Sequence, residues 1–104
     1  MWRWVFSFMF YLKDSWFTPN TYDSNFAYPP ESEGIYVIVE PSIGFLYIGS
    51  SINLWQRYNR HEVLRMLNHT YGYVQFYFTK CENSKSLEKH LIKTLQPKYN
   101  KQHK

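Results

Sequence analysis

The sequence predicts a single small α+β domain, because short apolar strands alternate with amphipathic helices along its 104 residues. One observation is a pair of apolar runs at residues 34–40 and 45–49, separated by a turn signal, which is typical of a β-hairpin. The other is the helical spacing of apolar residues near the C-terminus. Aromatic residues make up 21% of the chain, so we expect an aromatic-rich core.

The N-terminal segment alternates as a strand does, and one of its faces is wholly aromatic. The aromatic positions are Trp2, Trp4, Phe6, Phe8 and Phe10. We expect this extra strand at residues 1–12 to cover the rest of the fold or to form an interface, in a homodimer or with a partner protein. Residues 18–33 form a connector, because Pro29 and Pro30 prevent regular pairing. The sequence therefore divides into an N-terminal segment, 1–33, and a main domain, 34–104.

The main domain begins with the predicted hairpin. Residues 34–40 form a buried strand, residues 41–44 the turn, and residues 45–49 the returning strand. A helix should follow from about Asn53, which is a favoured N-cap residue, to Leu67.

A third strand is expected from Tyr71 to Thr79, where β-branched and aromatic residues dominate. The final helix should begin between Ser84 and Ser86 and end before Pro97, because the residue before a proline disfavours helix. Its inward positions, spaced by four, are Leu87, Leu91 and Leu95. The predicted order of the main domain is strand, strand, helix, strand, helix.

Charge is distributed unevenly along the chain. Residues 53–104 contain ten lysines and arginines against three glutamates, a net charge of +7, whereas residues 1–52 carry a net charge of −3. This asymmetry indicates that the C-terminal half faces a polyanion, although a solvated basic surface would have the same composition.

Cysteine content and the N-terminal apolar run bear on location. The single cysteine, Cys81, excludes an internal disulfide and a thiolate zinc cluster, and it fits a reducing compartment. The run at residues 1–12 is too short to span a bilayer, and no small-residue cleavage site follows it. We expect a cytoplasmic protein without a membrane association.

Two tripeptides carry the strongest functional signal. Gly34-Ile35-Tyr36 and Tyr47-Ile48-Gly49 have ten residues between their tyrosines, Arg57 follows Tyr47 by ten positions, and Glu88 opens the last helix. This pattern resembles the signature of the GIY-YIG nuclease family over residues 34–100. The segment LEKHLIKTLQPKYN is most similar to the nuclease domain of the bacterial excision-repair protein UvrC. The resemblance implies a small mixed β-sheet flanked by helices and the hydrolysis of phosphodiester bonds.

The resemblance also implies roles for individual residues. Glu88 would bind one Mg²⁺ or Mn²⁺ ion per active site, and Arg57 would contact the scissile phosphate. Tyr36 would act as general base, with Tyr47 orienting water or phosphate. A free phenol has a pKa near 10, so this role requires neighbours that lower it. Each of these residues could instead have an ordinary role, as a packed tyrosine, a surface arginine or a first-turn helix glutamate.

Four further positions match the family pattern. His61, one turn after Arg57, could accept the tyrosine proton, hold the phosphate or be purely structural. Asn100 would brace the site, and Gly34 and Gly49 would permit close backbone approach. Ser50 occupies a position at which some relatives carry a lysine.

The expected function is that of a divalent-metal-dependent DNA endonuclease with low sequence specificity or a preference for DNA structure. RNA remains open as a substrate. The residues expected to contact nucleic acid are Arg60, Arg65, Lys89, Lys93 and Lys98. One alternative is a non-catalytic nucleic-acid-binding module on the same fold, and another is a catalytic subunit that needs a partner for target choice. A small module of this kind would fit a phage or mobile element.

Overall fold

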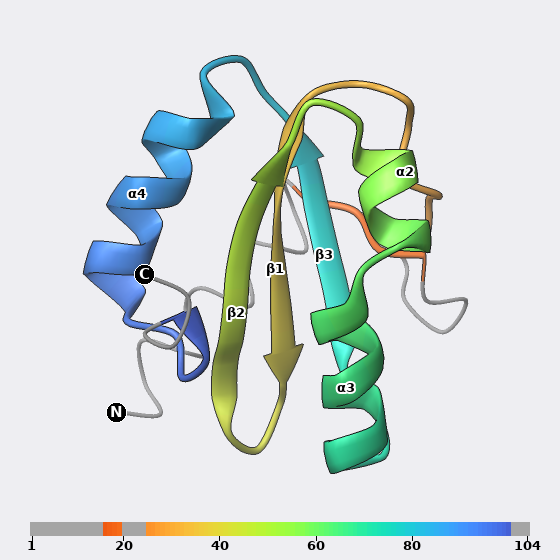
Figure 1. The fold of residues 1–104 in the computed structure, drawn as a ribbon, viewed down its shortest axis with the longest axis vertical. Helices are drawn as coiled ribbons and strands as arrows, with labels where there is room; N and C mark the ends of the chain where they lie inside the picture. The colour runs from red at the N-terminus through yellow and green to blue at the C-terminus, as the bar shows by residue number, and fades with distance from the viewer. Residues whose placement is uncertain (1–15, 20–24, 101–104) are drawn as a thin grey trace.

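The computed structural model describes residues 16–19 and 25–100 and confirms the α+β fold class (Figure 1). The predicted aromatic strand at residues 1–12 lies outside the described residues. The elements, in chain order, are β1 Gly34–Glu40, β2 Gly44–Ser51, α2 Leu54–Asn59, α3 Glu62–Tyr71, β3 Gln75–Lys80 and α4 Ser84–Leu95. Within these ranges, no helix has the length and apolar character needed to cross a membrane.

The three strands form a sheet in the order β2-β1-β3, with β1 in the centre. Tyr36 on β1 lies opposite Gly49 on β2 and Phe78 on β3. Both pairings are antiparallel, so the expectation of a mixed sheet was wrong for the described strands. The reason is that β2 and β3 run in the same direction but are separated by β1, and therefore never pair with each other.

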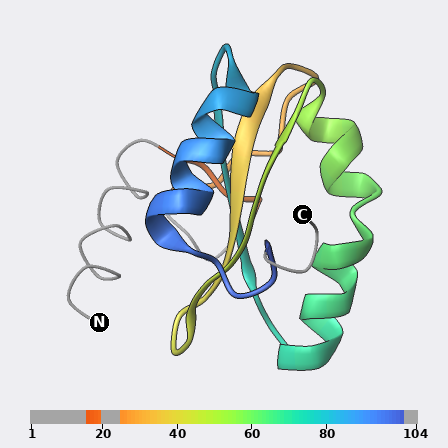
Figure 2. The same cartoon turned by 60° about the vertical axis from the view of Figure 1, so that its left-hand side comes forward.

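Helices cover both faces of the sheet, as Figure 2 shows, with α4 on one side and α2 and α3 on the other. The alternation of β1 supplies both cores, because successive strand residues point to opposite faces. The core on the α4 side contains Ile35, Val37, Val39, Phe45, Ile48, Tyr77 and Trp16. The core on the α2–α3 side contains Tyr36, Ile38, Leu46, Leu54, Leu64, Leu67, Val74, Phe76 and Phe78.

The hairpin contains a β-bulge. Ile38 pairs with Tyr47 whereas Val39 pairs with Phe45, so Leu46 is an extra residue on β2. Leu46 and Tyr47 consequently both lie on the α2–α3 side, although they are consecutive in the sequence. The turn ends at Gly44, whose φ of +111° favours glycine.

The predicted helix from Asn53 to Leu67 is in fact two helices, which was the largest error of the sequence analysis. Asn53 caps α2 as predicted, with its Oδ1 accepting the Gln56 N–H at 3.0 Å. The helix then ends at Asn59, and His61 becomes the N-cap of α3. Because His61 is buried at 1% exposure and caps α3 with its own side chain, the chain cannot continue as one helix through this point.

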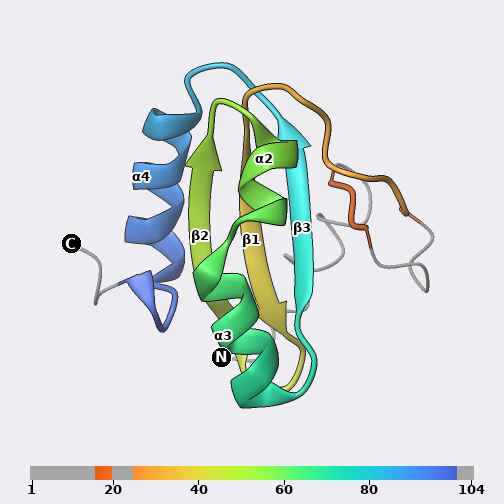
Figure 3. The same ribbon diagram turned by 45° about the vertical axis from the view of Figure 1, so that its right-hand side comes forward.

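The third strand was predicted to begin at Tyr71, but it begins at Gln75. Tyr71 instead ends α3, and Gly72, with φ +80°, closes that helix. In Figure 3 α2 and α3 lie in front of the sheet, and the chain after α3 turns back into β3.

The final helix matches its prediction closely, running from Ser84 to Leu95 with Leu87, Leu91 and Leu95 packed against the core. Its N-terminus is capped from a distance. Glu33 Oε2 accepts both the Ser84 N–H at 3.1 Å and the Ser84 hydroxyl at 2.8 Å. These two bonds, together with a negative charge at the helix N-terminus, fix α4 beside the start of β1.

Asn100 closes the open edge of β2. Its Oδ1 accepts the Ile48 N–H and its Nδ2 donates to the Ile48 carbonyl, both at 2.8 Å. The two preceding residues continue this pairing, since the N–H of Lys98 donates to Phe45 O and the N–H of Tyr99 to Leu46 O. The chain after α4 thus takes the place of a neighbouring strand and covers the unpaired edge.

We predict that Asn100→Ala destabilises the fold by about 2–4 kcal/mol, because it leaves a buried N–H and a buried C=O of Ile48 without partners. Urea denaturation measures the change. Thr94→Ala is the matched control, since the exposed Thr94 hydroxyl bonds only to a carbonyl of its own helix, and it should change stability by less than about 0.5 kcal/mol. Equal stability of Asn100→Ala and wild type would contradict the bracing role.

Candidate active site

Tyr36 lies at the centre of the site, with its side chain only 1% exposed. Its hydroxyl accepts the Arg57 Nε–H at 3.1 Å and lies 2.7 Å from His61 Nε2. The Tyr47 ring stacks beside the Tyr36 ring at 6.3 Å between centroids. Gly49 faces the same hydroxyl, and a Cβ at that position would collide with Tyr36 Oη. The structure therefore brings four of the predicted catalytic residues together, and Gly49 makes their approach possible.

The helix break determines the protonation of His61. Its Nδ1 accepts the Leu64 N–H at 3.2 Å, so this nitrogen carries no proton. Burial, followed by the charges of Arg57 and Arg65, lowers the pKa of His61 to about 3. The neutral ring therefore carries its proton on Nε2 and donates it to the Tyr36 hydroxyl.

The Tyr36 oxygen thus receives two N–H donors, one from His61 and one from Arg57. Burial has the largest effect and the pKa of this phenol is raised overall, so its neighbours do not lower the pKa below the ordinary value as was expected for a base; the Arg57 hydrogen bond and charge oppose the rise. Two donated hydrogen bonds and an adjacent cation stabilise a phenolate more than a phenol. Arg57 and His61 therefore offset part of the cost of ionising a buried tyrosine.

Glu88 approaches from the other face of the sheet, on α4. Its Oε1 accepts a hydrogen bond from the Ser50 hydroxyl at 2.6 Å. The carboxylate is close enough for its charge to raise the pKa of Tyr36. Since β2 is the outer strand on this side, the site extends around its edge, with tyrosines, Arg57 and His61 on one face and Glu88 and Ser50 on the other.

The Ser50–Glu88 bond is a feature that sequence reasoning missed. The two residues are 38 positions apart, and no local pattern reports a contact over that distance. Alternation along β2 was the available signal, since it places Ser50 on the α4 side, opposite Ile35.

The residues around Glu88 fit a hydrated divalent ion. Across residues 16–19 and 25–100, no three His, Cys, Asp or Glu side chains come together as a metal cluster. A single carboxylate with a neighbouring hydroxyl suits Mg²⁺, which prefers oxygen ligands and retains several waters, and does not suit a structural zinc ion. Glu88 and Ser50 are thus the residues that would position such an ion.

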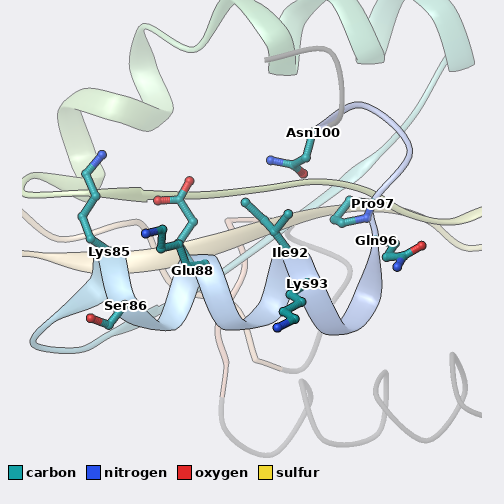
Figure 4. Close-up of a pocket in the computed structure, with 9 residues that line it drawn as sticks. Lys85, Ser86, Glu88, Ile92, Lys93, Gln96, Pro97 and Asn100 are labelled. Carbon is teal, nitrogen blue, oxygen red and sulfur yellow. The ribbon is translucent and has the colours of Figure 1, made fainter. Parts of the chain in front are cut away.

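Glu88 also lines a surface pocket of about 1070 Å³ beside α4. In Figure 4 Lys85 and Glu88 extend from the same side of α4, whereas Ser86 and Lys93, which also line the pocket, point away from that side. Lys89 lines the pocket as well. The carboxylate is therefore surrounded by basic side chains on its own helix, which favours an anion near it.

The other predicted positions lie outside this centre. Gly34 supports it indirectly, because a Cβ there would collide with Leu54 of α2 and the Thr79 carbonyl. Lys98 lies at the opposite end of α4, where its Nζ donates to the Tyr71 hydroxyl at 3.2 Å and lies over the rings of Tyr71 and Tyr99. Arg60 and Arg65 lie beside Arg57 at the α2–α3 break.

Comparison with protein families agrees with this geometry. Residues 32–100 match the family model of the GIY-YIG catalytic domain. The chain belongs to this family. GIY-YIG domains are nuclease domains and generally use a divalent metal, so the chain carries a nuclease domain, which implies a DNA substrate. Searches of curated proteins and of solved structures found no match.

We predict that acidification from about pH 7 to pH 5 destabilises the protein through His61. Its pKa is about 3 in the folded state against 6.5 ordinarily, so below pH 6.5 the unfolded state binds more protons and stability falls as pH falls. The slope approaches about 1.4 kcal/mol per pH unit, the value for one proton.

His61→Asn tests this assignment, because asparagine retains the N-cap of α3 but does not titrate. Urea denaturation at several pH values should show a shallower slope for the variant. Identical slopes for the two proteins would show that His61 does not titrate as the buried geometry requires.

Proposed function

We propose that the chain is a divalent-metal-dependent endonuclease that hydrolyses DNA phosphodiester bonds with low sequence specificity or a preference for DNA structure. One observation carries the proposal. The buried Tyr36 hydroxyl accepts hydrogen bonds from Arg57 and His61, and Glu88 lies close to it across the edge of β2. This arrangement combines a proton acceptor, a cation for phosphate and a carboxylate for metal in one place.

In the proposed reaction, water attacks phosphorus, a new P–O bond forms and the bond to the leaving sugar oxygen breaks. Tyr36 acts as the base in its phenolate form, which the two N–H donors stabilise, and it becomes the neutral phenol when it takes the proton of the attacking water. Tyr47, half-buried beside it, orients water or phosphate. Arg57 neutralises charge on the scissile phosphate. A divalent ion held by Glu88, one per site, would polarise the phosphate and neutralise the leaving oxygen.

His61 is a positioning residue in this scheme. Its Nδ1 is occupied by the cap of α3 and its Nε2 donates to Tyr36, so the ring orients the phenol rather than accepting its proton or holding phosphate. Gly49 has a related role, because its backbone leaves room for the Tyr36 hydroxyl. Asn100 holds the strand segment between Tyr47 and Gly49 through the backbone of Ile48.

The alternatives make different use of the same residues. A non-catalytic binding module would use the basic side chains Arg60, Arg65, Lys89, Lys93 and Lys98 but would not need the Ser50–Glu88 hydrogen bond. That bond favours the catalytic proposal. We also propose Mg²⁺ as the preferred ion and a cytoplasmic site of action in a phage or mobile-element context. The aromatic segment at residues 1–12 would be the surface for a protein partner or a second copy of the chain.

Glu88→Gln should lower the rate at which supercoiled plasmid DNA is cut in Mg²⁺ by roughly a hundredfold or more, because the amide is a poor metal ligand. Gel analysis of nicked and linear forms measures it, and EDTA should stop the wild type. Glu82→Gln, which removes an exposed carboxylate just before α4, is the matched control and should cut normally. Cutting by Glu88→Gln at the wild-type rate, or by wild type in EDTA, would overturn the metal-dependent assignment. If neither protein cuts but both bind DNA, the binding module takes its place.

Ser50→Ala should weaken binding of Mn²⁺ by about tenfold, because the hydroxyl orients the Glu88 carboxylate. Electron paramagnetic resonance of Mn²⁺ measures binding directly and independently of cleavage. Ser50→Thr retains the hydroxyl and should restore affinity, while Ser86→Ala, an exposed serine of α4, serves as control. Unchanged Mn²⁺ affinity in Ser50→Ala would show that the bond only supports packing.

A further inference from the structure

The break between α2 and α3 creates a second cationic feature beside the active site. A surface pocket of about 400 Å³ is lined by Arg57, Arg60, Glu62, Val63 and Arg65. Three of these five residues are arginines, and Arg57 is the same side chain that contacts Tyr36. The pocket is therefore continuous with the candidate active site through Arg57.

The backbone adds further positive potential. α3 is ten residues long, and its first two amides, those of Glu62 and Val63, have no carbonyl four residues earlier within the helix to bond to. The cap does not use them, because His61 Nδ1 accepts the Leu64 N–H instead. A helix N-terminus with such amides favours an anion.

The arginines are partly fixed in place. Arg65 Nη2 donates to the Asn59 carbonyl at 2.8 Å, which ties it to the end of α2. The Nε of Arg57 is occupied by Tyr36 and its guanidinium also forms a hydrogen bond with the Tyr47 side chain, so its other N–H groups provide the remaining donors. Arg57 and Arg65 line the same pocket, and the charges of both lower the pKa of the neighbouring His61. Glu62 is the one acidic residue of the lining, so the pocket keeps a net positive charge.

We propose that this pocket binds a second phosphate of the substrate strand, next to the scissile phosphate contacted by Arg57. The ligand is a phosphodiester anion, for which guanidinium groups provide paired donors. The inference rests on the proposed function and deepens it, because it gives the substrate DNA strand a path past Tyr47 and Arg57 toward the N-terminus of α3. Sequence specificity is not needed, since phosphate contacts position a strand without reading its bases.

The test uses Glu88→Gln protein, which binds without cutting, and a fluorescent DNA duplex measured by anisotropy. Adding Arg60→Gln should weaken binding roughly three- to tenfold at low salt and reduce the salt slope by about one phosphate contact. Arg60 is chosen because Arg65 also holds the end of α2. Lys80→Gln is the matched control, an exposed cation at the end of β3 on the opposite edge of the sheet.

A set of duplexes, each with one neutral methylphosphonate, locates the contact. At one position the substitution should weaken binding of the Glu88→Gln protein but cause no further loss when Arg60→Gln is also present. Glu62→Gln should tighten binding, and more so than Glu82→Gln, which makes the same charge change away from the pocket. Melting curves establish that each variant is folded.

If methylphosphonate at every position weakened DNA binding equally in the Glu88→Gln protein with and without Arg60→Gln, the second phosphate site would be overturned while the nuclease proposal stayed intact. So would an Arg60→Gln effect no larger than that of Lys80→Gln. Failure of the Glu88→Gln protein to bind DNA at all would instead contradict the proposed function itself.

Discussion

The burial of one phenolic oxygen is the constraint on which the rest of the site depends. A buried hydroxyl requires hydrogen-bonding partners, and Tyr36 obtains them from His61 and Arg57. To reach it, His61 must leave the helical path, and its second nitrogen then starts α3. Only a glycine fits on the opposite strand, where Gly49 faces the hydroxyl. The helix break, the tautomer of His61 and the glycine of the second tripeptide thus all follow from the same oxygen.

A second constraint is that the site extends around the edge of a strand. Glu88 and Tyr36 belong to opposite faces of the sheet, so their relative position depends on how α4 is held. Two long-range contacts hold it. Glu33 caps its first turn, and Asn100, five residues after the helix ends, is bonded to the backbone of Ile48. Both contacts act on the ends of the helix, which leaves the surface around Glu88 open to a ligand.

The sequence allowed the fold class, both strands of the hairpin, the cap at Asn53 and the last helix to be predicted, because each has a local signal. The break at His61 has none, since histidine is not a typical N-cap and apolar residues continue at helical spacing through it. The start of β3 was placed too early because Tyr71, an aromatic residue typical of strands, ends a helix here. The Ser50–Glu88 bond arises from tertiary packing alone.

The β-bulge at Leu46 gives the spacing of the two tripeptides a physical meaning. If Leu46 took a regular place in the ladder instead of forming the bulge, the alternation along β2 would turn Tyr47 toward α4 and away from Tyr36. The ten residues between the tyrosines therefore comprise a turn and a paired part, which differ in how they tolerate a change of length. The turn between Glu40 and Gly44 can change length without moving either tyrosine, whereas the paired part has a fixed parity. Insertions and deletions in this hairpin are thus expected to accumulate at its tip, and one residue inserted into the paired part without a second bulge would separate the two tyrosines onto opposite faces.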